Sequence, residues 1–205
     1  MCGRFTLTAP SERVISHFKL TNNVVLKPRY NIAPSQPIPV IRTVGVVDFL
    51  AWGFRPSWLA EDKPGFINAR SETLSEKPAF KKAFRKQRCL IIADGYFEWK
   101  AVGKKKQPFY ITLQDKSLLA LAGIWDGDTC GIITMEAKAE LASIHQRMPV
   151  IIAEKYYEDW LSPQVKASQI EAMMKTTTLF NFEYYSVSTV VNNPKIDGKE
   201  CIAAL

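Results

Sequence analysis

Long apolar stretches are absent from this chain of 205 residues. It contains no run of about 18 consecutive apolar residues, the length that a membrane-spanning helix needs. Its first residues do not combine a charged segment with a following apolar one, so we expect no secretory signal peptide. These two absences predict a cytoplasmic protein that does not enter a membrane.

Cysteine and histidine are also scarce, which argues against metal and disulfide chemistry. The chain has two histidines and four widely spaced cysteines, with no CxxC pair. Zinc sites use closely spaced Cys and His ligands, and disulfide frameworks are unusual in the cytosol. We therefore expect no metal and no other cofactor. Cys89 and Cys130 lie in apolar runs and are expected in the core, so Cys2 is the cysteine with a chemical interpretation.

The charge balance and the pattern of short elements suggest a globular domain with a polyanionic partner. Lys and Arg number 27 against 20 for Asp and Glu, giving a net charge of +7. This excess favours a polyanion without establishing one. Many short apolar runs with intervening helical patterns predict an α+β fold for residues 1–205. We expect one domain with a mixed or antiparallel, barrel-like sheet and peripheral helices.

Several elements can be placed by pattern. The spacing of apolar residues predicts a helix that is capped by Thr8 or Ser11 and runs through about Phe18, and a basic helix over 77–86. Residues 89–93 and 96–100 are predicted as strands joined at Asp94-Gly95, and 104–106 as the tip of a hairpin.

Cys2 follows the initiator methionine, and removal of Met1 would make it the amino-terminal residue. Its α-amine and thiol would then sit on adjacent carbons, with ordinary pKa values of about 8 and 8.5. Such an aminothiol condenses with an aldehyde to an imine and then closes to a thiazolidine ring. Taken alone, the dipeptide is more typical of a small apolar residue at a frayed end.

Three further sites offer polar chemistry. Glu98 stands between Phe97 and Trp99, where desolvation would raise its pKa, although simple alternation would instead turn it to solvent. His145 falls in an expected loop, where histidine acts near neutral pH or serves a structural role. Asn68 and Arg70 share one face if their segment is extended, which suits an oxygen-rich anion or a salt bridge.

In order and in context, these residues resemble the SOS-response-associated peptidase (SRAP) family. The motifs that carry the resemblance are Met1-Cys2-Gly3-Arg4-Phe5, Arg29-Tyr30-Asn31-Ile32-Ala33-Pro34, Trp52-Gly53, Ile67-Asn68-Ala69-Arg70-Ser71-Glu72-Thr73, Ala93-Asp94-Gly95-Tyr96-Phe97-Glu98-Trp99-Lys100 and Ile144-His145-Gln146-Arg147-Met148-Pro149.

The resemblance implies a monomeric protein, nucleoid-associated when acting, that captures abasic sites in single-stranded DNA. Cys2 would form a thiazolidine crosslink with the opened sugar, and Asn68 would hold that sugar. Glu98 would relay protons and assist removal of Met1, and His145 would protonate the sugar oxygen or support strand cleavage. The implied DNA contacts are Arg4, Asn31, Pro34, Trp58, Arg70 and Arg147.

The chain departs from the family pattern at two places. Leu59 replaces a second aromatic residue, which weakens expected base stacking, and Met148 replaces an arginine that would bind phosphate. Two other functions remain open. One is an amino-terminal-nucleophile glutamine amidotransferase, whose chains also begin Met-Cys-Gly. The other is a single-stranded DNA-binding module in which Cys2 is inert.

Overall fold

Two β-sheets form the centre of the molecule in the computed structural model, which describes residues 2–60 and 62–205. Within this part of the chain, one sheet has five strands in the order β12-β8-β7-β1-β2. These strands are β1 (Arg4–Leu7), β2 (Arg29–Ile32), β7 (Gly95–Val102), β8 (Lys105–Leu113) and β12 (Phe182–Ser186). All of its pairings are antiparallel.

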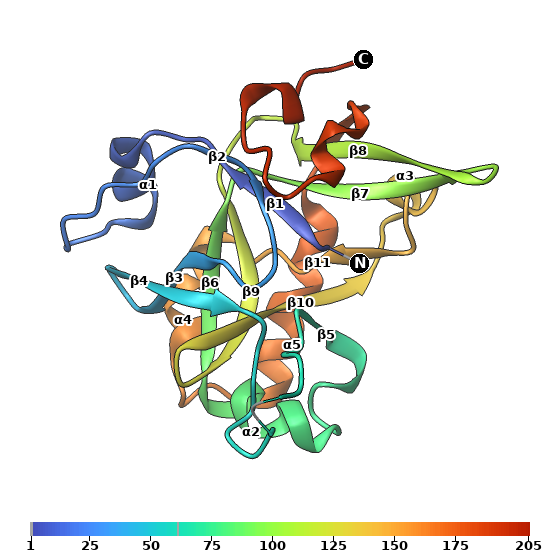
Figure 1. Ribbon diagram of the computed structural model, residues 1–205. Helices are drawn as coiled ribbons and strands as arrows, with labels where there is room; N and C mark the ends of the chain where they lie inside the picture. Colours follow the sequence, from blue (N-terminus) through green and yellow to red (C-terminus); the bar gives the residue numbers. More distant parts are fainter. Residues whose placement is uncertain (1, 61) are drawn as a thin grey trace.

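The second sheet, with seven strands in the described residues, curls on itself (Figure 1). Its strands are β3 (Pro37–Thr43), β4 (Val46–Trp52), β5 (Asn68–Arg70), β6 (Arg88–Ala93), β9 (Leu119–Asp126), β10 (Thr129–Glu136) and β11 (Arg147–Pro149). Strand β10 pairs antiparallel with β9 and β11 and parallel with β4 and β5. This branching makes a twisted, ring-like sheet that is not a closed barrel, and it confirms the predicted mixed, barrel-like α+β fold.

Short helices surround the sheets, with α4 and α5 behind the ring-like sheet and α2 at its lower end in Figure 1. The α-helices are α1 (Ser11–Phe18), α2 (Pro78–Lys86), α3 (Ala139–Ala142), α4 (Tyr157–Leu161) and α5 (Ala167–Lys175). The 3-10 helices are η1 (Ser71–Thr73), η2 (Glu154–Tyr156), η3 (Thr176–Leu179), η4 (Thr189–Asn192) and η5 (Lys199–Cys201). Among the described residues, no helix is long and apolar enough to cross a bilayer.

The Asp94-Gly95 step carries the chain from one sheet to the other. Strand β6 pairs with β3 and β9, whereas β7 pairs with β1 and β8, so the two predicted strands exist but belong to different sheets. The Asp94 carboxylate accepts hydrogen bonds from the backbone N–H groups of Thr8 and Ala9. A side chain at Gly95 would clash with the Tyr110 hydroxyl, because a Cβ there would lie 2.3 Å from it. The chain can therefore pass between the two sheets here only with glycine at position 95. This passage places β7 beside β1.

Candidate active site

Cys2 lies just before β1 and is completely buried. Its carbonyl oxygen accepts a hydrogen bond of 2.9 Å from the Asn68 side-chain nitrogen, and its Sγ lies 3.9 Å from the Arg4 carbonyl oxygen. Burial raises the pKa of the Cys2 thiol, and the charge of Glu98 raises it further. The thiol is therefore neutral at physiological pH in this environment. Met1, whose removal the sequence predicts, lies outside the described residues.

Glu98 is buried on β7, with 2% of its surface exposed. The alternation that would turn it to solvent fails because both faces of β7 are covered. Phe97 packs in a small apolar cluster beneath the carboxy-terminal segment, whereas Tyr96 packs in the main core. Glu98 shares the Tyr96 face, since strand residues two apart point the same way. Burial raises the pKa of the Glu98 carboxyl to about 7, which suits it to both give and take a proton.

His145 lies between α3 and β11, with its Nδ1 atom 4.0 Å from Glu98 Oε2. That separation is too long for a hydrogen bond. Nδ1 instead accepts a bond of 3.0 Å from the backbone N–H of Arg147, so the neutral ring carries its proton on Nε2. Burial lowers the pKa of His145, and nearby positive charges including Lys106 and Arg147 lower it as well. At pH 7 the ring is thus neutral, with a donor at Nε2.

Strand β5 places Asn68 and Arg70. It pairs parallel with β10, with Asn68 opposite Ile132 and Arg70 opposite Thr134, which confirms that the segment is extended. Asn68 donates to the Cys2 carbonyl, as described above. Its Oδ1 atom is buried and has no hydrogen-bond partner among the described residues. This oxygen is an available acceptor beside Cys2.

Arg147 is held in a fixed geometry at the start of β11. Its guanidinium forms bonds of 2.6 and 2.9 Å with the two carboxylate oxygens of Glu72 and also donates to the Thr134 carbonyl oxygen. The bond to Arg147 lowers the pKa of Glu72 to about 2. Arg147 therefore presents a positioned cation whose charge is shared with Glu72. A DNA phosphate would have to compete with Glu72 for the Arg147 guanidinium.

A cavity of about 840 Å³ adjoins His145 and Arg147. Arg70, His145 and Arg147 line it together with Trp99 and Lys106. A second cavity of about 380 Å³ is lined by Glu98, Trp99, Lys106, His145 and Asn192. The structure thus brings together Cys2, Asn68, Glu98 and His145 from four distant segments and places Arg70 and Arg147 at the cavity wall.

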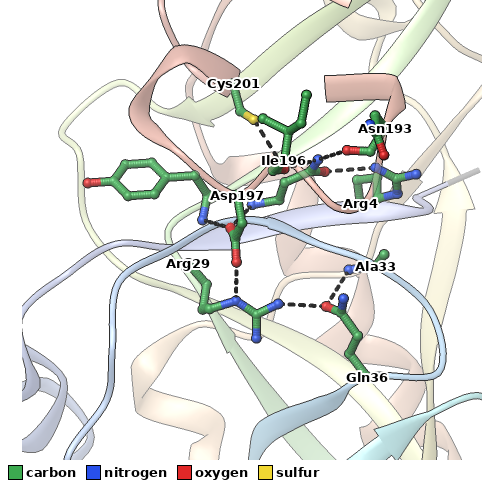
Figure 2. A network of polar contacts seen from close by, with 10 residues as sticks. Arg4, Arg29, Ala33, Gln36, Asn193, Ile196, Asp197 and Cys201 are labelled. Carbon is green, nitrogen blue, oxygen red and sulfur yellow. Dashed lines mark hydrogen bonds and ion pairs between the residues drawn. The ribbon is translucent and has the colours of Figure 1, made fainter. Parts of the chain in front are cut away.

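Two predicted DNA contacts occupy a structural network instead (Figure 2). Asn31 is fully buried, and its side-chain nitrogen donates to the carbonyl oxygens of Val191, Asn193 and Ile196. The Asn31 side chain thus has no exposed surface in the structure, and its contact with DNA stays a prediction. Arg4 donates to Asn31 Oδ1 and to the carbonyl oxygens of Val191 and Asn192. Arg4 therefore ties β1 to the carboxy-terminal segment.

Trp58 and Pro34 lie apart from the cavity lining. Trp58 has 63% of its surface exposed in the loop after β4, and this loop is held by a bond from the Ser57 backbone to Asp126. Pro34 is half-buried in the turn between β2 and β3, where Ser35 adopts a φ of 70°. Base stacking by these two residues stays a prediction.

The sequence interpretation missed three residues that line the cavities. Trp99 lay in a recognised motif but was given no role, and its indole N–H donates to Asn192 Oδ1 over 2.8 Å. Asn192 follows Glu98 by more than ninety positions, so no local pattern connects them. The sequence predicts Lys106 at the tip of a hairpin, whereas the structure places it in β8. The described residues contain no cluster of His, Cys, Asp and Glu suited to a metal ion, and the four cysteines are free thiols.

Comparisons with known proteins show the family and the fold of the chain. A family model described as SOS response associated peptidase (SRAP) matches residues 1–194. Abasic site processing protein YoaM of Bacillus subtilis is 36% identical over 223 residues, covering 100% of this chain and 98% of that relative. Abasic site processing protein YedK of Escherichia coli is 32% identical, covering 98% and 99%. A crystal structure of a Bacteroides thetaiotaomicron protein has the same fold, with a TM-score of 0.86 at 24% identity over 100% of both chains.

Proposed function

Because the chain belongs to the SOS response associated peptidase (SRAP) family, we propose that it captures abasic sites in single-stranded DNA covalently through Cys2. Its curated relatives YoaM and YedK are named abasic site processing proteins, which supports a role in DNA damage. The observation that carries the proposal is the convergence of Cys2, Asn68, Glu98 and His145, of which Glu98 and His145 line a cavity. His145 also lines the adjoining cavity, whose wall carries Arg70, Lys106 and Arg147.

The covalent step begins once Met1 is removed. The Cys2 amine adds to the aldehyde carbon of the opened sugar, and loss of one water gives an imine. The Cys2 sulfur then adds to the imine carbon while the thiol proton passes to the nitrogen, which closes the thiazolidine. Glu98, with a pKa of about 7, donates the proton that the departing hydroxyl needs and takes one back from the amine. The amine acts first, because the buried thiol is neutral.

Asn68 and His145 act on the sugar. The Asn68 Oδ1 atom is an acceptor that holds a sugar hydroxyl or the new N–H group next to Cys2. His145 donates a hydrogen bond from Nε2 to the ring oxygen, which stabilises the negative charge that develops there as the closed sugar opens to the aldehyde, because its Nδ1 already accepts the Arg147 N–H. Glu98 takes the proton from the sugar hydroxyl and returns it to the ring oxygen.

Two further activities follow from the same groups. Self-removal of Met1 requires a water to attack the Met1–Cys2 peptide bond, with the Glu98 carboxylate as the base. Strand cleavage proceeds through the imine, when a base removes the proton next to the imine carbon and the 3′ phosphate leaves. The Glu98 carboxylate is the candidate for that base. His145 supports the step by donating a hydrogen bond from Nε2 to the departing phosphate, because its Nδ1 is occupied by the Arg147 N–H.

DNA is held by contacts to its backbone and its bases. Arg70 is exposed at the wall of the larger cavity and is free of the ion pair that engages Arg147 within the described residues. A guanidinium binds phosphate through two parallel N–H groups, so Arg70 is the first phosphate contact and Arg147 the second. Trp58 offers an exposed ring for stacking, which suits lesions that occur in any sequence.

The test uses protein whose trimmed amino terminus has been verified by mass. It is mixed with a single-stranded oligonucleotide that carries one abasic site, and the products are separated on a denaturing gel. We expect a heat-stable, slower band that requires both Cys2 and the lesion. Cys2→Ala and an oligonucleotide with all bases intact serve as controls. Absence of the band would overturn covalent capture, leaving a binding module or, if glutamine is hydrolysed, an amidotransferase.

A further inference from the structure

Lys106 holds a central place in the hollowed surface around Glu98 and His145. It lies at the start of β8, where it pairs with Ala101 across the β7–β8 hairpin. Among the described residues, it is the one side chain that lines both cavities of the candidate site and a third cavity beyond them. The three cavities therefore share a single residue, which carries a positive charge.

The third cavity is a groove of about 700 Å³ between the hairpin and the carboxy-terminal segment. Its lining consists of Val102, Lys105, Lys106, Gln107, Thr189 and Asn192. This lining carries two lysines and no acidic side chain, so its charge is positive. The groove continues the surface of the smaller cavity, because the two share Lys106 and Asn192.

Both walls of this groove are held in place. The Gln107 side-chain nitrogen donates to the Val187 carbonyl oxygen over 2.8 Å, which ties the hairpin to the carboxy-terminal segment. Asn192 accepts the Trp99 indole N–H and is itself held through its backbone by Arg4. A groove with fixed walls loses little entropy when a chain binds in it.

We propose that Lys106 binds a DNA phosphate next to the abasic sugar and that the strand continues from the site along this groove. The inference rests on the proposed function and extends it with a second arm of the binding surface. Arg70 and Arg147 line the first arm, and Lys105 and Lys106 line the second. A single strand carries one phosphate for each nucleotide, so a path through the site requires cations on both sides of the lesion.

The charge of Lys106 also acts on the site itself. It contributes to the lowered pKa of His145, which places the ammonium within electrostatic range of that ring. A phosphate bound to Lys106 would therefore lie beside the group that acts on the sugar. The position of Lys106 therefore favours a contact with the phosphate next to the lesion over a contact with a distant nucleotide.

Lys104 provides the matched control, because it lies at the same hairpin tip and is exposed but lines none of these three cavities. Binding is measured by fluorescence anisotropy in a Cys2→Ala background, with an oligonucleotide that carries a tetrahydrofuran abasic analogue. This probe has no aldehyde, so only noncovalent affinity is read. The measurement is repeated over a range of salt concentrations, and thermal unfolding checks that each variant folds.

Lys106→Ala is expected to weaken binding about tenfold and to reduce the slope of log affinity against log salt by about 0.7, the value for one phosphate contact on a single strand. Lys106→Arg should retain most of the affinity. Lys104→Ala should change affinity less than about twofold. Equal effects of Lys106→Ala and Lys104→Ala on affinity and slope would overturn the inference.

A second measurement separates this inference from the proposed function. Trimmed protein with Cys2 intact is treated with a small aldehyde that has no phosphate, and the adduct is followed by mass. Cys2→Ala is the control and should form no stable thiazolidine adduct, because it lacks the thiol that closes the ring. If the protein with Cys2 intact also forms no adduct, covalent capture fails, whereas the anisotropy result still decides the role of Lys106.

Discussion

At the scale of single residues, the site depends on burial that shifts two pKa values in opposite directions. Burial raises the pKa of Glu98 to about 7 and lowers the pKa of His145. Both shifts favour the neutral form, as expected when a charge would be removed from water. Near pH 7 the site therefore contains a carboxyl group that exchanges its proton readily and a neutral imidazole that donates from Nε2.

Glu98 should also make stability depend on pH. Its pKa is about 7 in the folded protein against a usual 4.5, so the folded state holds a proton that the unfolded state releases between these values. The contribution of Glu98 to the free energy of unfolding is full below pH 4.5 and is lost as the pH rises through 7. Relative to Glu98→Gln, the unmodified protein should lose about 3 kcal/mol of unfolding free energy over this window.

Urea unfolding at pH 5 and pH 8 measures this difference. Glu76→Gln is the control for the same substitution at an exposed position. If Glu98→Gln shows the same pH dependence as the unmodified protein, the carboxyl is not desolvated as described.

At the scale of elements, a buried arginine joins α2, β6 and α4. Arg88 is 2% exposed, and its guanidinium donates to the carbonyl oxygens of Phe84, Arg85, Trp160 and Ser162. These are carbonyls at or near the ends of α2 and α4, which helices leave without internal partners. Burial lowers the pKa of Arg88 to about 10, so the group remains charged at neutral pH. A cation at the carboxyl end of a helix also interacts favourably with the helix dipole.

Arg88→Met should therefore lower the free energy of unfolding by about 3 kcal/mol, because several buried carbonyl oxygens lose their donor. Arg85→Ala, at the end of the preceding helix α2 and with an exposed side chain, should change it by less than about 0.5 kcal/mol. Chemical denaturation monitored by circular dichroism compares the two. Similar losses in both variants would contradict the role assigned to Arg88.

At the scale of the whole molecule, the carboxy-terminal segment completes the site from a distance. Asp197 accepts the backbone N–H groups of Tyr30 and Asn31 and the Arg29 side chain, which fastens the segment to β2 (Figure 2). The segment in turn supplies Asn192, which holds Trp99 at the cavity wall. Residues near both ends of the chain thus shape one surface.

Asp197→Ala should loosen this segment while the core stays folded. Trypsin should cut after Lys195 and Lys199 about tenfold faster, because loss of these bonds costs on the order of 1.4 kcal/mol or more in local stability. Glu200→Gln, in the same segment with an exposed side chain, should leave the cleavage rate unchanged. Mass spectrometry of timed digests gives both rates, and equal rates would show that Asp197 does not fasten the segment.

The sequence alone determined the elements with strong local patterns and the family. Helix α2 begins one residue from its predicted start, and the hairpin of β7 and β8 forms at the predicted tip, because periodicity and turn residues are local signals. The capping prediction was wrong: Pro10 precedes α1, while the hydroxyls of Thr8 and Ser11 bond to Asp94 and Leu26. These partners are distant in sequence, so no local pattern could reveal them.

Tertiary structure alone decided which polar residues gather at the candidate site and which take part in structural networks. Asn31 and Arg4 stand in family motifs, yet their partners are carbonyl oxygens more than 150 residues away. Glu98 is buried because the two faces of β7 are covered by different parts of the chain. Lys106 lines the same two cavities as His145 because β7 pairs with β8 and with β1. Burial and convergence depend on long-range packing, whereas residue chemistry and local pattern are written in the sequence.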